Sequence, residues 1–410
     1  MYKISILKSE NFHNTLCLIL ISLLPLSLLI GSLVINIFCI SIIIIFLFES
    51  FKERNFDFLK SYEFLILLLF WFFLLINTFL STSFENSVGR GFGFARFILL
   101  VFALRYYFTL NNQKYFKFIQ LSWLIIFLIV TFDLLFESYF GFNTLGFKSS
   151  YQGRLSGFLN DELKIGGYYY GFVLLTATYI LINHKKYFYI SFLIFILTAL
   201  LIGERANFLK ILLMSIPFII FLNYGAKIKA KYFLIVIIFS ILTTINYKPE
   251  FKKRFYYDFF DTKNQIISLQ IFKKRIEKHY AHYSTSYKIF KDNFWFGVGL
   301  KNFRNESNKE KYLISEGEKY LGWSTHPHQI HFEFLSETGL VGYFVFFFFF
   351  MISFFKGLKN YLISKNLYSL CGSLFIFTTF LPLIPSGSFF TTYGATIFWI
   401  NYSLIDLKKI

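Results

Sequence analysis

Three histidines gather in residues 324–342, where a polar stretch runs into a long apolar one. His326 and His328 stand on either side of Pro327, and His331 follows three residues after His328. Titratable side chains at the entrance to a membrane-length apolar segment are costly to keep there, so they are a functional hypothesis by default. A neutral imidazole can take a proton near neutral pH. The segment therefore predicts a site for proton transfer at a membrane boundary.

The local sequence also predicts how this site is built. Proline lacks an N–H and fixes its φ angle, so Pro327 suits the first turn of a helix, with Thr325 or His326 as the cap. His328 is then expected in the first turn, at the positive end of the helix dipole, which disfavours the imidazolium form. We predict that His328 is a neutral catalytic base, with His326 beside it in the same site.

Two glycines follow on the predicted helix. Gly339 and Gly342 fall within about 40° of His328 around an ideal helix, which would let another helix approach closely below the histidine. Two other interpretations stay open. The segment could be a solvated, histidine-rich helix start without chemistry. The histidines together with Glu333 could instead hold zinc. No cysteine or close acidic cluster joins them, so we expect no metal.

Two arginines interrupt the apolar sequence elsewhere. Arg205 stands between two apolar runs, and Arg154 lies in a polar segment before another. An ion pair with Glu204, or snorkelling to the interface, would satisfy these cations structurally. The planar guanidinium also matches phosphate oxygens in a bidentate way. With a histidine base, two such arginines could support transfer from a lipid diphosphate donor without a metal or other cofactor.

The rest of the chain is made of membrane-length apolar runs. Of its 410 residues, 56% are hydrophobic, and the mean hydropathy is +0.56, which is too apolar for a soluble protein. Runs of about 17–20 residues can cross the membrane as helices and do not fit the shorter strands of a barrel. We expect an all-α polytopic membrane protein with about twelve transmembrane helices, near 14–31, 33–49, 62–80, 88–107, 117–137, 165–183, 187–203, 206–223, 231–246, 331–354, 366–384 and 390–405.

The placement of charge predicts the topology. The net charge of +18 could suggest nucleic acid, but Lys and Arg recur in alternate segments between the apolar runs. Cytoplasmic loops carry such an excess, so we expect both termini in the cytoplasm and no nucleic-acid partner. The segments expected are 1–137 with helices 1–5, 138–164 as a first periplasmic segment, 165–246 with helices 6–9, 247–330 as a large, mostly helical periplasmic loop, and 331–410 with helices 10–12.

Several motifs together resemble a known family. His328-Gln329, nine further residues and Gly339-Leu-Val-Gly342 match a ligase pattern of His, then Asn, Ser or Gln, then nine residues and Gly-x-x-Gly. Other resembling segments are a G-x-G-x-x-x-F segment at 296–303, two outer-loop arginine motifs at 154–162 and 203–205, and a late segment at 382–390. On these residues the chain resembles the O-antigen ligase / O-antigen polymerase superfamily of bacterial membrane glycosyltransferases.

The resemblance implies metal-independent transfer of a glycan from undecaprenyl diphosphate on the periplasmic face of the bacterial inner membrane. The acceptor would be lipid A–core or another glycan, and the protein would also contact membrane lipids. His328 would be the catalytic residue, and the substrate-binding residues would be Arg154, Arg205, His282 and His326. The family often has an arginine in the large loop, where this chain offers Arg275, His279 or His282.

The resemblance leaves alternatives within and beyond the superfamily. Ligases often have two threonines after the last glycine, where this chain has Tyr343 and Phe344. An O-antigen polymerase, which joins lipid-linked repeat units, and a protein-glycosylating transferase are therefore also considered. A transporter of lipid-linked or small solutes is the alternative from a different class. Against a transporter, the candidate functional polar residues gather at the outer ends of the predicted helices, and the sequence shows no pair of broken helices.

Overall fold

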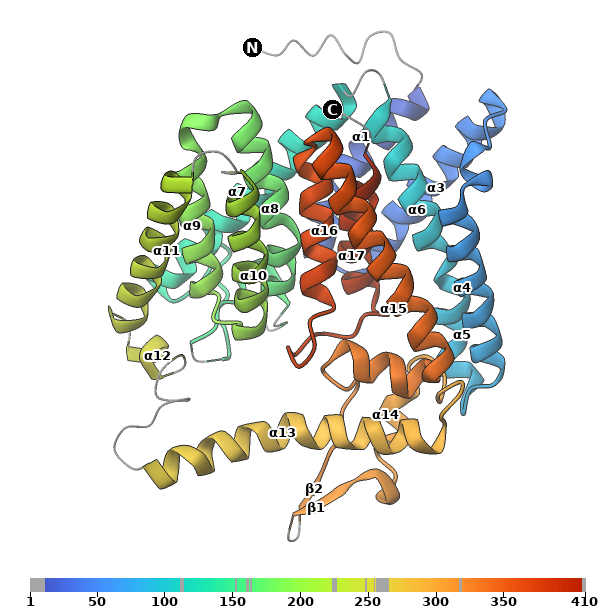
Figure 1. Ribbon diagram of the computed structural model, residues 1–410, viewed down its shortest axis with the longest axis vertical. Coiled ribbons are helices and arrows are strands. Elements are labelled where there is room, and N and C mark those ends of the chain that lie inside the picture. The colour runs from blue at the N-terminus through green and yellow to red at the C-terminus, as the bar shows by residue number, and fades with distance from the viewer. Residues whose placement is uncertain are drawn as a thin grey trace.

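The computed structural model is a bundle of helices that run between two ends, with one long helix laid across one of them (Figure 1). The structure describes residues 12–110, 114–151, 153–159, 162, 164–222, 227–247, 249–253, 255, 265–316 and 319–407. Helix α1 begins and α17 ends at the same end of the bundle. The all-α class expected from the sequence is confirmed, apart from one short hairpin of strands described below.

The first part of the chain forms α1 (Phe12–Ser22), α2 (Leu24–Ile30), α3 (Ser32–Glu53), the 3-10 turn η2 (Asp57–Lys60), α4 (Tyr62–Phe79), α5 (Phe84–Gly93), α6 (Ala95–Thr109) and α7 (Lys114–Phe140). Helices α1 and α2 meet at a bend of 53°. Pro25 lies at the start of α2, where its missing N–H costs no helical bond. The bend thus divides one predicted apolar run into two short helices.

The middle part forms η4 (Gly157–Leu159), α8 (Ile165–Asn183), η5 (Lys185–Tyr187), α9 (Phe188–Leu201), α10 (Arg205–Leu222) and α11 (Lys227–Tyr247). The final part forms α15 (Ile330–Ser364), α16 (Leu367–Thr379), α17 (Thr392–Ser403) and the 3-10 turn η8 (Leu404–Asp406). The predicted span 366–384 is too long at its end, because α16 stops at Thr379. Pro382 and Pro385 follow and cannot continue a helix.

The twelve predicted runs each fall on a helix or on a pair of consecutive helices. Within the described residues, seven helices are long and apolar enough to cross a membrane, or eight if the bent pair α1 and α2 forms one span. Helices α9, α16 and α17 have 14, 13 and 12 residues, fewer than a full hydrocarbon core requires. The multi-pass character follows from these helices, while the count of about twelve stays a prediction.

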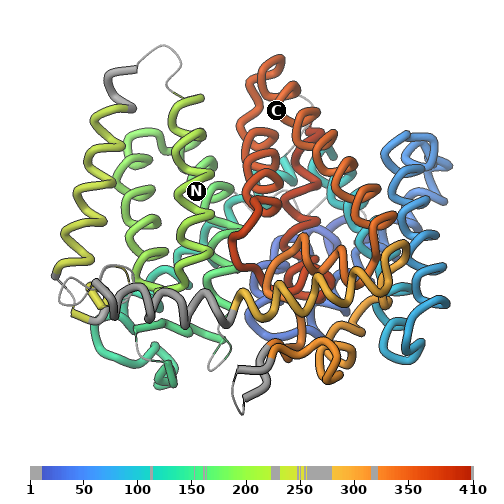
Figure 2. The backbone as a smooth tube through the Cα atoms, turned by 60° about the horizontal axis from the view of Figure 1, so that its bottom comes forward, coloured from blue at the N-terminus to red at the C-terminus, as the bar shows by residue number. Residues whose placement is uncertain are grey.

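Residues between α11 and α15 form a cap across one end of the bundle. The cap contains α12 (Pro249–Lys252), α13 (Gln265–Asp292), α14 (Phe303–Glu306), the turn η7 (Glu310–Tyr312) and the antiparallel strands β1 (Ile314–Glu316) and β2 (Lys319–Leu321). Helix α13 runs across the helix ends instead of along them (Figures 1 and 2). Helix is the main structure of this segment, as the sequence predicts.

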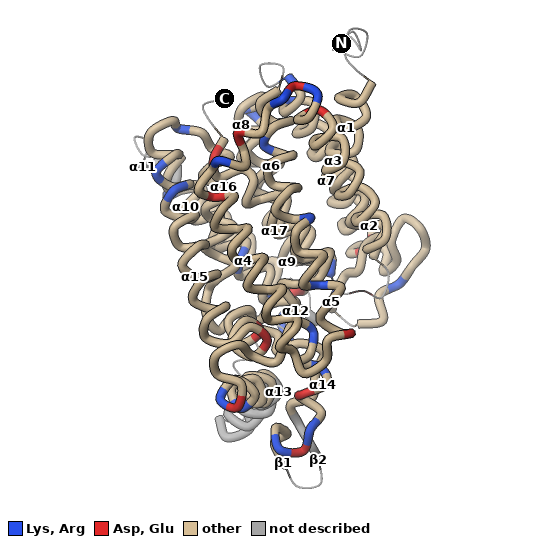
Figure 3. Tube along the Cα trace, turned by 90° about the vertical axis from the view of Figure 1, so that its right-hand side faces the viewer, with Lys and Arg blue, Asp and Glu red and all other residues tan. Residues whose placement is uncertain are grey.

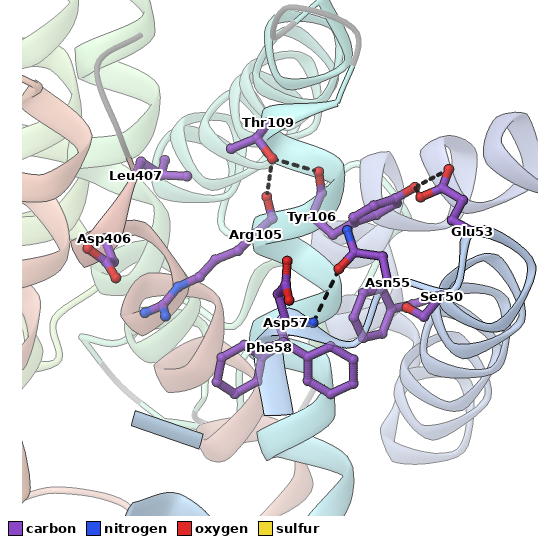
Figure 4. Close-up of a pocket in the computed structure, with 12 residues that line it drawn as sticks. Ser50, Glu53, Asn55, Asp57, Phe58, Arg105, Tyr106, Thr109, Asp406 and Leu407 are labelled. Carbon is purple, nitrogen blue, oxygen red and sulfur yellow. Dashed lines mark hydrogen bonds between the residues drawn. The ribbon is translucent and has the colours of Figure 1, made fainter. Parts of the chain in front are cut away.

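Charged residues concentrate toward the two ends of the bundle, with fewer in its middle (Figure 3). At the end opposite the cap, Glu63 of α4 receives hydrogen bonds from Arg105 of α6 at 2.8 Å and from Lys356 of α15 at 3.3 Å. Lys356 also pairs with Asp406 at 2.7 Å. A cavity of about 460 Å³ lies beside this network, lined by residues that include Glu53 and Asp406 (Figure 4). This cavity is thus far from the histidine-rich segment.

Candidate functional site

His328 lies just outside helix α15, which corrects the sequence prediction. The helix begins at Ile330, and Gln329 is its N-cap, because the Gln329 side chain accepts a hydrogen bond from Phe332 N at 3.1 Å. Pro327 therefore does not start the helix, and His328 is not in its first turn. His328 instead has a φ of 59° in the left-handed region, and its carbonyl accepts a hydrogen bond from Ser386 N at 2.8 Å. This long-range bond holds the turn that precedes the helix.

The His328 ring is the centre of a cluster of imidazoles. Its ring centroid lies 4.1 Å from that of His326, 5.2 Å from that of His282 and 6.3 Å from that of His279. Its Nε2 lies 3.0 Å from the Ser324 hydroxyl oxygen. His282 and His279 come from α13, so the cap and the segment before α15 build the cluster together. The sequence expectation that these histidines share one site agrees with this geometry.

Burial keeps the two central histidines neutral. Burial, followed by the charges of the neighbouring His326, His282 and His279, lowers the pKa of His328 to about 3. Burial is also the main cause that lowers the pKa of His326 to about 4; His282 adds to the decrease, and a hydrogen bond with the Ser386 backbone opposes it. The sequence pointed to a helix dipole as the cause of neutrality, whereas desolvation and neighbouring imidazoles are the causes here. Both rings are therefore uncharged at neutral pH, each with a free lone pair on one ring nitrogen.

His331 faces a different environment. Its Nδ1 lies 3.1 Å from the Tyr343 hydroxyl, and its Nε2 lies 2.8 Å from the Phe380 carbonyl oxygen. Both ring nitrogens thus serve packing between α15 and the end of α16. Among the residues that the structure describes, no group of three or more His, Cys, Asp or Glu side chains is arranged to hold a metal ion. The zinc interpretation, which grouped His331 and Glu333 with the other histidines, gains no support.

Glu333 instead anchors the loop that holds His328. Its carboxylate is 1% exposed as part of α15 and accepts hydrogen bonds from the Ser388 hydroxyl and from Phe389 N, the latter at 2.8 Å. Arg90 of α5 donates to the same Ser388 hydroxyl at 3.4 Å. Sequence reasoning missed Arg90, and it marked the 382–390 segment without giving Ser388 a role. The only signal was the presence of a charged residue within a predicted span, and nothing in the sequence indicated a link to residue 388.

The glycine motifs meet at a break in α15. Gly339 has φ 67° and ψ −171°, so the helical hydrogen bonds stop there. The segment before α14 satisfies the freed groups, since Val298 N donates to Ser336 O at 2.9 Å and Leu340 N donates to Phe294 O at 2.8 Å. A Cβ on Gly339 would overlap the Trp295 carbonyl group. The G-x-G segment and the Gly-x-x-Gly segment are therefore two halves of one backbone junction.

The second glycine has the packing role that the sequence suggested. A Cβ on Gly342 would meet the Phe73 ring of α4 at 2.5 Å. Gly339, by contrast, accommodates the 295–296 backbone rather than a helix. The predicted alignment of both glycines below His328 fails, because His328 precedes the helix and Gly339 interrupts it.

The two arginines are brought onto neighbouring segments. A Cβ on Gly203 would clash with the Gly153 carbonyl and lie 3.4 Å from Arg154 Cα. The turn before α10, which starts at Arg205, therefore packs directly on the segment that carries Arg154. Glu204 accepts hydrogen bonds from Gly166 N at 3.1 Å and from the Asn207 side chain at 2.6 Å. Its carboxylate thus ties the start of α8 to the start of α10.

The arginine pair and the histidine cluster come from different elements. Arg154 belongs to the segment before α8 and Arg205 is the first residue of α10, whereas the histidines belong to α13 and to the segment that leads into α15. Helix α13 and the start of α15 lie at one end of the bundle, and the turn that leads into α10 points to this same end (Figure 1). The segments that carry the arginines and the histidines are therefore at the same end of the bundle.

The comparison with known families matches this part of the chain. A family model described as O-Antigen ligase matches residues 190–347, which is less than half of the 410 residues. The matched stretch includes Arg205, His282, His326, His328 and both glycines of the α15 junction, and leaves Arg154 outside. The resemblance to the O-antigen ligase / O-antigen polymerase superfamily is thereby confirmed. No curated protein matches the chain.

Proposed function

We propose that the chain is an O-antigen ligase-like glycosyltransferase, which moves a glycan from undecaprenyl diphosphate to a lipid A–core acceptor. The observation that carries the proposal is the cluster of histidine rings around the half-buried His328, within the stretch that the O-antigen ligase family model matches. Members of this superfamily act on lipid-linked glycans in membranes. A multi-pass helical bundle with a proton acceptor at one end suits that chemistry.

His328 acts as the base in the proposed reaction. It takes the proton of an acceptor hydroxyl as the acceptor oxygen bonds to the sugar carbon and the bond from that carbon to the diphosphate oxygen breaks. With a pKa of about 3, the imidazole is a weak base on its own. The negative charge of a bound diphosphate raises the pKa of a nearby histidine, so donor binding itself strengthens the base. Ser324, at 3.0 Å from Nε2, orients the ring.

Arg154 and Arg205 bind the donor diphosphate in this proposal. Their segments are in direct backbone contact at Gly203, so two guanidinium groups can approach one ligand. Each guanidinium can make a bidentate contact with phosphate oxygens and stabilise the charge that develops on the leaving group. His282 and His326 line the path between diphosphate and base. Transfer is proposed to need no metal, since arginines stand where a divalent cation would otherwise bind.

The proposed arrangement in the cell follows from the charge pattern. Both termini lie in the cytoplasm of a bacterium, about twelve helices cross the inner membrane, and the 247–330 segment and the site face the periplasm. In this proposal the transmembrane segments are 1–137, 165–246 and 331–410, and 138–164 is the first periplasmic segment.

A polymerase reaction is the second candidate. Tyr343 occupies a position where ligases often have threonine, and its hydroxyl lies 3.1 Å from His331 Nδ1. The polymerase would use the same base and arginines, but its acceptor would be another lipid-linked repeat unit.

The test is the surface glycan of a deletion strain complemented with variants. Wild type and His184→Ala, which removes an exposed histidine at the other end of α8, should both restore the glycan. His328→Ala should lose transfer by roughly 10²–10⁴-fold, as expected for a general base, at a normal membrane level. Accumulation of unligated lipid-linked polymer indicates the ligase, and single repeats on the core indicate the polymerase. Full restoration by His328→Ala would refute the proposed base.

A further inference from the structure

Helix α10 carries a buried lysine that the proposed mechanism does not use. Lys210 is 4% exposed and lies within Arg205–Leu222, one of the candidate membrane spans. Its ammonium lies 5.7 Å from the centre of the Tyr170 ring of α8. Among the residues that the structure describes, no carboxylate and no hydrogen-bond acceptor contacts the Lys210 ammonium. Its polar contact there is the face of the Tyr170 ring.

Two other cations within the bundle, Arg105 and Arg96, have hydrogen-bond or ion-pair partners. Arg105 has the Glu63 carboxylate at 2.8 Å, and Arg96 donates to Gly93 O at 2.7 Å and to Thr392 at 3.3 Å. A cation inside a membrane span without such a partner is costly, and the face of one aromatic ring compensates only part of that cost. A charged Lys210 therefore needs an anion that this part of the chain does not supply.

The position of Lys210 directs it to the same end as the arginines. It follows Arg205 by five residues, about 7.5 Å along a helix axis. Side chains of a helix tilt toward its N-terminus, which for α10 is the end with Arg205. Tyr170 is fixed at the same level, because its hydroxyl contacts Thr378 at 2.7 Å and Thr379 at 2.9 Å, the last residues of α16. Lys210 thus lies one to two turns from Arg205 along the helix axis and about 140° around it, on the side of α10 that faces Tyr170 of α8.

The proposed reaction creates a negative charge that the donor lacks. When the bond from the sugar carbon to the diphosphate oxygen breaks, the electron pair stays on that oxygen, and the acceptor proton goes to His328. The leaving polyprenyl diphosphate therefore carries about one more negative charge than the glycosylated donor. A cation that is unpaired in the free protein stabilises this product, and the transition state before it, more than the donor.

We infer that Lys210 is a third cationic contact for the donor, which takes up the charge that develops on the departing polyprenyl diphosphate. The inference rests on the proposed function and adds a residue to it. Arg205 and Arg154 hold the diphosphate at the rim, and Lys210 meets its lipid-proximal side from below.

The experiment measures binding of two probes, undecaprenyl diphosphate and undecaprenyl phosphate, to the full-length protein in nanodiscs. The variants are Lys210→Met, which keeps length without charge, and Lys210→Gln, which keeps a donor group. Lys231→Met, which removes an exposed lysine of α11, is the matched control. Loss of Lys210 should weaken binding of the diphosphate by about tenfold or more, with a smaller effect on the monophosphate, while Lys231→Met should bind as wild type does.

Each outcome decides the matter. Binding of undecaprenyl diphosphate that is unchanged in a folded Lys210 variant would overturn the inference and leave the proposed function intact. Failure of wild type to bind either probe would refute the proposed function, and with it this inference. If both Lys210 variants fail to fold while Lys231→Met folds, the ammonium serves the end of α16 rather than a ligand, and the inference is wrong.

Discussion

Gly339→Ala should separate α15 from the loop that supports it. Gly339 has φ 67° and ψ −171°, a region that essentially only glycine occupies. A Cβ there would overlap the Trp295 carbonyl group and lie 2.5 Å from Phe296 N. Both obstacles are backbone atoms, so no side chain can rotate away to relieve the overlap.

The cost follows from strain and from lost hydrogen bonds. A non-glycine residue in this region costs about 1–3 kcal/mol. Moving the loop away also weakens bonds such as Gly299 N to Glu337 O at 2.9 Å and Leu340 N to Phe294 O at 2.8 Å, each worth about 1 kcal/mol net. The total destabilisation should be at least about 3 kcal/mol. With about 2–4 °C per kcal/mol, the unfolding temperature should fall by roughly 6 °C or more.

The assay is thermal unfolding of the purified protein in detergent, with Gly89→Ala as the matched control. Gly89 is helical and exposed, and no heavy atom lies within 4 Å of the place that a Cβ would take. Alanine there should stabilise α5 by up to about 1 kcal/mol. Limited proteolysis provides a second measurement, since cleavage near residues 293–302 should accelerate only in Gly339→Ala. Equal unfolding temperatures and equal cleavage for the two variants would refute the reasoning about this junction.

Other expectations concern the site and the topology. Arg205→Lys should lose most transfer activity at a normal membrane level, because lysine lacks the bidentate guanidinium fork. Transfer by the wild-type protein should persist in EDTA. Loss of transfer in EDTA that a metal restores would contradict the proposal that arginines bind the diphosphate without a metal. The pKa values of His326 and His328 are lowered in the folded protein to about 4 and about 3, so the unfolded chain binds protons first as the pH falls below about 6.5. The free energy of unfolding should therefore decrease by about 2 kcal/mol per histidine between pH 7 and pH 5. A melting temperature that stays constant over this range would contradict the burial of the two rings. A membrane-impermeant thiol reagent should label Lys309→Cys but not Lys185→Cys in permeabilised-outer-membrane cells, against a background of buried native cysteines; the reverse pattern would invert the topology.

Local patterns predicted the elements well, because helix formation depends on neighbours in the chain. Each apolar run became helical, and the proline-rich stretch with Pro382 ended α16. Spacing also located Gly339, although not its partner. The loop at 294–299 is about forty residues away in sequence, and pairing of that kind is decided by tertiary packing.

The wrong predictions have a common physical cause. Pro327 favours a helix start, but the bond from Ser386 to the His328 carbonyl and the Gln329 cap place the start later. Arg90 contacts residue 388 across nearly three hundred positions, and such a relation leaves no local trace. The sequence likewise offered no reason to single out Lys210, because a lysine in an apolar run is usually one whose side chain extends to the membrane interface.

The first part of α15 sets a fixed distance and rotation between two anchored positions. His328 is held at one end by Ser386, and Gly339 is held at the other by the 294–299 backbone. An inserted residue between them would rotate one end against the other by about 100° and shift it by about 1.5 Å. Glu333 would then leave Phe389 N, which it now meets at 2.8 Å. A single insertion or deletion between positions 330 and 338 should therefore abolish transfer, and cells that need transfer should not retain it. A change of length in the hairpin of β1 and β2 should be tolerated.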